Sequence, residues 1–285
     1  MTENTFLASA SGVQTPRIIY GTAWKKTRTQ ELVTKAVQLG FRGIDTACQP
    51  KHYDEAGVGA GIAACLTEDL SRADLYLQTK FTPLSGQDPN RVPYDPRACL
   101  ADQVAQSFQE SLRNLRTTYL DCLVLHSPLS DARQLREVWH AMEAIYDNAG
   151  ARQLGISNCY SLQYLDSLCR SVRVKPAVVQ NRFYADTNYD GEIRAFCRAR
   201  QIIYQSFWTL TANANVLAHP RLAALASEYR RTPAQILFRY LTLVEIVPLV
   251  GTKTEAHMRE DLEIFGFELT DGERDALSTL FYTST

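Results

Sequence analysis

Four polar side chains with the types needed for acid–base chemistry lie where short apolar runs end. The run Phe41 to Ile44 is typical of a buried strand, and Asp45 follows it directly, with Tyr53 in the next loop. LYLQTK ends on Lys80, and LDCLVLH ends on His126. Parallel strands bring their carboxyl ends to one face, where α/β proteins carry their chemistry. We therefore expect these four groups to converge, although each one alone is more often a helix cap, a surface charge or part of the core.

The elements that must position them alternate along the whole chain. Segments of helical periodicity, such as Val104, Phe108, Leu112 and Leu115, separate eight apolar strand-like runs. Gly40 and Gly150 follow two such segments and read as helix C-terminal ends. This pattern predicts one domain over residues 1–285, an α/β fold of the (β/α)8 TIM barrel class. The expected strands are Ile18 to Gly21, Gly43 to Asp45, Leu75 to Thr79, Leu120 to Leu125, Gln153 to Ile156, Ala177 to Gln180, Ile202 to Gln205 and Ile246 to Leu249.

Composition limits the classes of partner. The chain has 285 residues, 45% of them apolar, and its 30 basic and 31 acidic residues leave a net charge of −1. No basic field favours nucleic acid or an anionic membrane, so a small molecule is the expected partner. The N-terminus lacks the features of an export signal, and the seven scattered cysteines have no C-x-x-C spacing. We expect a soluble cytoplasmic protein without disulfides and with no metal site; its oligomeric state stays unassigned.

Polar groups at two further strand ends suit an amide ligand. GISN ends on Ser157 and Asn158, and VVQN carries Gln180 near its end. Such hydroxyl and amide groups could bind a planar carboxamide, which needs donors and acceptors together. Helix capping by Ser157 or Asn158 is an equally good explanation. The string GVGAGI, by contrast, lacks the last glycine of a Rossmann loop and no strand runs into it, so we expect it to begin a closely packed helix.

Taken in order, GTAW, GFRGIDTA, the tyrosine before DEAGVG, QTK, YLDCLVLHSP, GISN, VVQN and GTKTEAHMREDL resemble the aldo-keto reductases across essentially the whole chain. The resemblance implies a (β/α)8 barrel that binds NADPH without a Rossmann domain and transfers hydride to an aldehyde or ketone. It implies that Tyr53 is the proton donor, that Lys80 and Asp45 tune it, and that His126 orients the carbonyl. Ser157, Asn158 and Gln180 would hold the nicotinamide carboxamide.

The resemblance also places the rest of the cofactor near residues 250–262. His257 stands where an arginine often grips the adenosine 2′-phosphate, which leaves Lys253 as the clear cation. NADPH is therefore the first choice and NADH is possible, because lysine lacks the bidentate fork of arginine. The remaining cofactor contacts implied are Thr22, Asp45, Phe207, Leu210, Gly251, Thr252, Lys253, His257 and Asp261.

Substrate selectivity is expected to depend on Trp24, His126, Trp208 and the loop from Phe81 to Arg97. The sequence ends at Thr285 without the long C-terminal loop of many family pockets, which implies an open site. Counting back from AGVG puts His52 at the family's tyrosine position. We prefer Tyr53, because a local bulge can absorb one residue and imidazole would be a different acid.

The chemistry of the four groups agrees with those roles. A phenol has a pKa near ~10, and a neighbouring ammonium lowers that pKa by roughly one to three units, so Lys80 should make Tyr53 a better acid. Asp45 would keep Lys80 charged. Two alternatives stay open on the same barrel. The protein could bind NADPH without catalysis, as a sensor or regulatory subunit, or Lys80 could form a Schiff base as in a lyase.

Overall fold

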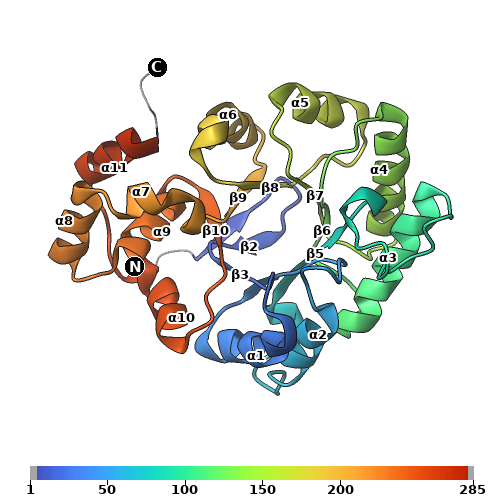
Figure 1. Ribbon diagram of the computed structural model, residues 1–285, viewed down its shortest axis with the longest axis horizontal. Helices are drawn as coiled ribbons and strands as arrows, with labels where there is room; N and C mark the ends of the chain where they lie inside the picture. Colours follow the sequence, from blue (N-terminus) through green and yellow to red (C-terminus); the bar gives the residue numbers. More distant parts are fainter. Residues whose placement is uncertain (1–4, 282–285) are drawn as a thin grey trace.

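Eight parallel strands close into a barrel in the computed structural model, which describes residues 5–281 (Figure 1). All eight strands predicted from the sequence are confirmed, with small shifts at their ends. The register places Asp45 beside Gln78, and Ser157 beside Gln180. In barrel order the strands are β10 (Ile246–Val250), β3 (Ile19–Gly21), β4 (Gly43–Asp45), β5 (Tyr76–Phe81), β6 (Cys122–Leu125), β7 (Leu154–Ser157), β8 (Val178–Arg182) and β9 (Ile203–Phe207).

Helices follow the barrel strands and form the outer ring in Figure 1. Their apolar stripes face the strands: Val104, Phe108 and Leu115 are all buried, as the periodicity predicted. The helices are α1 (Thr29–Leu39), α2 (Glu55–Ala63), α3 (Leu100–Leu115), α4 (Ala132–Asp147), α5 (Leu162–Ser171), α6 (Gly191–Ala199), α7 (Ala214–Leu217), α8 (Pro220–Tyr229), α9 (Pro233–Leu243), α10 (Glu255–Leu262) and α11 (Asp271–Ser278). None of the helices in residues 5–281 is long and apolar enough to cross a membrane.

The two glycines predicted to end helices have different roles. Gly40 ends α1 in the left-handed conformation, with φ of 119°, which favours glycine. Gly150 follows the end of α4 at Asp147 and its amide donates to the carbonyl oxygen of Ile145, but the left-handed residue there is Ala149, with φ of 57°. A Cβ on Gly150 would lie 2.7 Å from Cζ of Phe108, so this glycine lets α3 pack closely.

GVGAGI lies within α2, as the prediction of a closely packed helix requires. Its first turn is capped by the Asp54 side chain, which accepts a hydrogen bond from the Gly57 amide at 2.9 Å. A Cβ on Gly59 would lie 2.1 Å from the carbonyl oxygen of Asn114. The glycines therefore serve helix packing and not phosphate binding.

A short hairpin, which the sequence did not reveal, closes the amino-terminal end of the barrel. It consists of β1 (Phe6–Ala8) and β2 (Gln14–Pro16), which pair antiparallel. Leu7 and Val13 pack on the apolar residues inside the barrel. The Ser9 hydroxyl donates to Oε1 of Gln153 at 2.6 Å, just before β7. With this end covered, the barrel opens to ligands at the carboxyl ends of its strands.

Candidate active site

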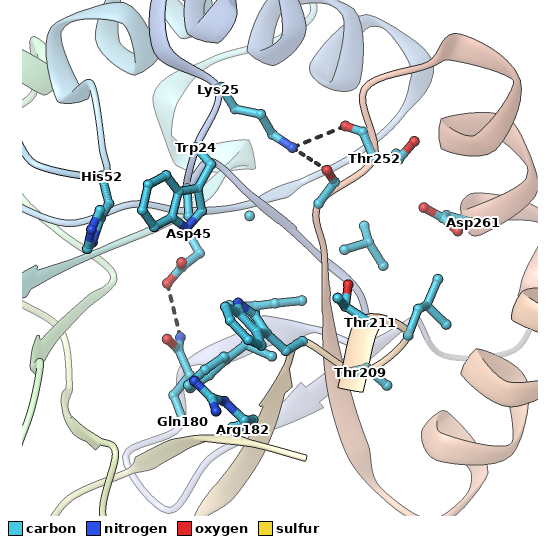
Figure 2. Close-up of a pocket in the computed structure, with 18 of the residues that line it drawn as sticks. Trp24, Lys25, Asp45, His52, Gln180, Arg182, Thr209, Thr211, Thr252 and Asp261 are labelled. Atoms are coloured by element: carbon cyan, nitrogen blue, oxygen red, sulfur yellow. Dashed lines mark hydrogen bonds between the residues drawn. The ribbon is translucent and has the colours of Figure 1, made fainter. Parts of the chain in front are cut away.

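A cavity of about 1130 Å³ opens at the carboxyl ends of the strands (Figure 2). This volume exceeds the ~300–1,000 Å³ typical of small-ligand pockets, so it has room for an extended cofactor together with a substrate. In Figure 2 the cavity extends from Trp24 and His52 on one side to Asp261 on the other. Its walls include most of the residues predicted for the site, namely Trp24, Asp45, Tyr53, His126, Ser157, Asn158, Gln180, Phe207, Trp208, Leu210, Gly251, Thr252, Lys253, His257 and Asp261.

A buried ion pair lies at the base of this cavity. Lys80 Nζ is 2.6 Å from Oδ1 of Asp45, and the two residues are 1% and 3% exposed. Gln78 is the register partner of Asp45, and Lys80 lies two residues further on the same face of β5. The ammonium also donates to the carbonyl oxygen of Thr46 at 2.7 Å. The strand register therefore produces the pair that the sequence predicted.

Three glutamines that the sequence did not single out as a group hold this carboxylate in place. Asp45 Oδ1 accepts from Nε2 of Gln78 at 2.7 Å and from Nε2 of Gln180 at 3.0 Å. Both amides also donate to Oε1 of Gln205, at 2.8 and 2.9 Å. The signal was present in the sequence, because QTK, VVQN and YQSF each place a glutamine near the end of a strand. Asp45 is thereby fixed from β5, β8 and β9.

Tyr53, and not His52, packs against the ion pair. Lys80 Nζ lies 5.2 Å from the centre of the Tyr53 ring, and the His126 ring lies 5.9 Å away, edge to face. The His52 ring instead stacks on Trp24, with the ring centres 4.0 Å apart. The amides of His52 and Tyr53 both donate to the carbonyl oxygen of Gln49, so the loop that follows Asp45 forms a turn here. This turn brings Tyr53 inward and leaves His52 at the rim.

The pKa of Tyr53 is not lowered, contrary to the prediction. Burial raises the pKa of this phenol well above its usual value, and the negative charge of Asp45 raises it further. The Lys80 ammonium is directed to Asp45 and Thr46, and it makes no hydrogen bond to the phenol. Tyr53 is therefore protonated throughout the neutral pH range, which is the form a proton donor needs.

His126 is neutral and held by the loop that follows β5. Burial lowers the pKa of His126 well below its usual value, and the positive charges of Lys80 and His52 lower it further. Its Nδ1 lies 2.7 Å from the hydroxyl oxygen of Thr82. Gln87 and Tyr94 in turn donate to the carbonyl oxygen of Thr82, at 3.2 and 2.8 Å. The loop from Phe81 to Arg97, which was expected to affect substrate selectivity, thus also positions the imidazole.

The groups predicted to bind a carboxamide lie together but are partly engaged with each other. The Ser157 hydroxyl donates to the carbonyl oxygen of Gln180 at 2.7 Å, and Asn158 Nδ2 donates to that of His126 at 2.8 Å. The N-cap residue of α5 is Ser161, so the alternative of helix capping by Ser157 or Asn158 was wrong. Gln180 Oε1 has no hydrogen-bond partner within residues 5–281. This free acceptor suits an amide N–H of a bound nicotinamide.

Lys25 is a site residue that the sequence analysis missed. Its Nζ donates to the carbonyl oxygens of Gly251 and Thr252 and so bridges the cavity wall (Figure 2). Burial lowers the pKa of Lys25 to about 8, and repulsion from Lys253 and Arg28 contributes. Such a cluster of cations is relieved by an anion, which fits the diphosphate of a nicotinamide dinucleotide. The first lysine of the pair after GTAW was the available signal.

The far end of the cavity has mixed charge. Lys253 and His257 line it together with Glu260 and Asp261. Burial raises the pKa of Asp261 to about 7, and the charge of Glu260 contributes to that shift. The cations suit a 2′-phosphate, whereas the carboxyl groups suit a ribose hydroxyl or an adenine amine.

Thr22 and Lys80 are the two predicted site residues that do not line the cavity. The Thr22 hydroxyl donates to the carbonyl oxygen of Asp45 at 2.8 Å and is fully buried, so it supports β4 and does not face a ligand. Lys80 lies behind the wall, bound to Asp45 and Thr46. A buried, ion-paired amine is a poor nucleophile, which argues against a Schiff base at Lys80.

Comparison with known proteins agrees with this architecture. The sequence matches the Aldo/keto reductase family over residues 17–280. YtbE of Bacillus subtilis (strain 168), described as an uncharacterised oxidoreductase, is 28% identical over 87% of this chain and 82% of its own. The glyoxal reductase of the same strain is 26% identical over 88% of this chain and 82% of its own. An aldo/keto reductase from Brucella melitensis has the same fold, with a TM-score of 0.81 and 24% identity over 96% of this chain and 98% of that one. This chain therefore belongs to the aldo/keto reductase family and is an NAD(P)H-dependent oxidoreductase.

Proposed function

We propose that the protein reduces a small aldehyde or ketone with NADPH, using Tyr53 as the proton donor. The observation that carries this proposal is the packing of a protonated phenol against both the Lys80 ammonium and the neutral His126 ring, in the wall of a large cavity. Bound NAD(P)H would supply the hydride. NADH remains the alternative cofactor.

Each residue of the site has a separate task. Tyr53 gives its proton to the carbonyl oxygen as negative charge grows there, because an alkoxide is a stronger base than a phenolate. His126 donates from Nε2 when Thr82 donates to Nδ1, and so orients the same oxygen. The Lys80 ammonium packs against the phenol and favours negative charge beside it, and Asp45 holds that ammonium in place. Trp24 and Trp208, each 48% exposed, would cover a substrate at the opening.

Charged groups along the cavity support the choice of cofactor. Lys25 is suited to the diphosphate, and Lys253 is suited to a 2′-phosphate. Gln180 Oε1 and the hydroxyl of Ser157 retain the capacity to accept from a carboxamide. Asp261 weakens the preference for NADPH, because its carboxylate form repels a phosphate. We therefore propose NADPH as the preferred cofactor, with substantial activity on NADH.

Free thiols at all seven cysteines agree with a cytoplasmic location.

The proposal is tested by replacing the proposed acid and its neighbour separately. Tyr53→Phe should reduce turnover of an aldehyde by on the order of 10²–10⁴ while leaving NADPH affinity unchanged, because only the hydroxyl is lost. His52→Gln is the matched control and should change turnover only a few-fold, since His52 stacks on Trp24 at the rim. NADPH oxidation followed at 340 nm measures turnover, and quenching of tryptophan fluorescence measures affinity.

Two other outcomes would redirect the assignment. If Tyr53→Phe keeps its activity and His52→Gln loses it, the proton donor is His52. If the unmodified protein binds NADPH but oxidises it with no member of a broad panel of aldehydes and ketones, the protein is a noncatalytic NADPH-binding member of the family.

A further inference from the structure

Arg182 presents a cation to the cavity. It is the last residue of β8, beside Phe207 of β9 in the register. Its guanidinium carbon lies 4.2 Å from the Trp208 ring and 5.2 Å from the Tyr184 ring. Within residues 5–281, Arg182 makes no ion pair, and its buried Nε has no hydrogen-bond partner. Arg182 lines the cavity, so a ligand there could supply the acceptor that this guanidinium lacks at its accessible N–H groups.

The position of Arg182 separates it from the other charges of the cavity. Figure 2 shows it beside Gln180, on the side of the cavity away from Asp261. The nearer carboxylate, Asp45, is already paired with Lys80. Glu260 and Asp261 belong to the opposite end, where Lys25 and Lys253 also gather. Arg182 therefore does not belong to the cation cluster that suits a diphosphate.

We propose that Arg182 binds a carboxylate on the substrate, so that the preferred substrates are carbonyl compounds that also carry a carboxylate. This proposal rests on the function proposed above. The aromatic rings of Trp208 and Tyr184 hold the guanidinium, which leaves its N–H groups for a planar acceptor. A carboxylate matches that fork with two hydrogen bonds. Arg182 lines the same cavity as Tyr53 and His126, which lie at the reacting end. Arg182 would thus be a specificity-determining residue.

The test compares aldehyde acids with their methyl esters, which keep the aldehyde but lack the negative charge. Glyoxylate, 4-oxobutanoate and 6-oxohexanoate are each assayed against their methyl esters, because the span from Arg182 to the carbonyl selects the chain length. At the best length, the KM of the acid should be lower than that of the ester by on the order of tenfold, which corresponds to about 1.4 kcal/mol. Arg182→Gln should abolish this preference by raising the KM of the acid far more than the KM of the ester. Arg182→Lys should keep part of it, since lysine keeps the charge but not the fork.

Controls separate this inference from other roles of Arg182. Arg170→Gln removes an exposed arginine that is paired with Asp166 on α5 and should leave the preference intact. Equal KM values for acid and ester at every length would overturn the proposal. So would an Arg182→Gln variant that loses acid and ester activity equally with a weaker Kd for NADPH, because Arg182 would then serve the cofactor.

A binding measurement keeps the inference decidable if the protein reduces nothing. Succinate, a dicarboxylate that cannot be reduced here, should change the fluorescence of Trp208 on binding, because the guanidinium it would contact lies on that ring. Arg182→Gln should lose this response. Failure of all aldehydes to react, with succinate binding intact, would refute the proposed function and leave the carboxylate site standing. Equal succinate binding by both proteins would refute the carboxylate site.

Discussion

Removing one member of the Asp45–Lys80 pair should destabilise the fold more than removing both. The two charges are 2.6 Å apart, so their attraction is about 6 kcal/mol at an effective dielectric constant of about 20. Burial of each ion costs several kcal/mol, which offsets that attraction, so the intact pair contributes little net stability. Loss of one partner leaves a buried charge and costs about 3–5 kcal/mol.

The structure also predicts which single variant loses more free energy of unfolding. Asp45→Asn leaves the Lys80 ammonium with only the carbonyl oxygen of Thr46 among its present acceptors. Lys80→Met leaves Asp45 with the amides of Gln78 and Gln180, and hydrogen bonds to a charged group contribute about 1.5–3 kcal/mol each. Asp45→Asn should therefore be the less stable of the two. The double variant should recover at least about 2 kcal/mol relative to the sum of the single losses.

Urea unfolding followed by tryptophan fluorescence, applied to all four proteins of the cycle, measures these differences. Asp147→Asn, which breaks an exposed ion pair with Arg173, is the control and should leave the free energy of unfolding unchanged within error. All three variants should lose aldehyde reduction, since Tyr53 packs against the pair. Single losses below about 1 kcal/mol, or losses that add within about 0.5 kcal/mol in the double variant, would refute the reasoning.

Two further predictions concern the far end of the cavity. The pKa of Asp261 is raised from 3.8 to about 7, so between these pH values the folded state holds a proton that the unfolded state releases. The free energy of unfolding that depends on this proton is therefore fully present below pH 4 and is lost as the pH rises to about 7. Asp261→Asn should therefore match the unmodified protein near pH 4 and exceed its stability at pH 8 by on the order of 1–4 kcal/mol, measured by urea unfolding at each pH. Equal differences at both pH values would contradict the assignment. His257→Arg supplies a bidentate fork, so it should improve kcat/KM for NADPH by on the order of tenfold with little effect on kcat/KM for NADH. Initial rates with both cofactors measure this difference. An equal gain with NADH would show that residue 257 does not face the 2′-phosphate.

The fold could be predicted from the sequence because the strand-like runs are short, apolar and separated by helical periodicity. The same regularity explains why Asp45 and Lys80 could be placed correctly. Each lies near the end of such a run, and the parallel register of β4 and β5 brings the two side chains together. The β1–β2 hairpin escaped prediction because its strands precede the alternation of strands and helices, and neither FLA nor QTP belongs to a buried apolar run. The packing role of Gly150 escaped prediction because a glycine needed for packing looks the same in sequence as one that ends a helix.

The chemistry of the site was harder to predict than its location. The shift in the pKa of Tyr53 depends on burial and on the side to which Lys80 points its ammonium, and neither is encoded by spacing. Lys25 and Arg182 were missed for a related reason. A lysine or arginine in a sequence is usually a solvated surface charge, and only the folded chain shows that Lys25 is 4% exposed and that Arg182 lies against Trp208.

Gln78 and Gln180 both bind one carboxylate oxygen of Asp45, and Gln205 accepts from both of their amides, so the three glutamines couple β5, β8 and β9. Gln205 lies outside the cavity wall, yet its side-chain oxygen Oε1 accepts from the two amides that hold Asp45. An evolving or engineered lineage therefore cannot exchange these residues one at a time without stranding a buried amide. Mutational libraries aimed at this pocket should treat the trio as a single unit of variation, and strong epistasis is the expected signature.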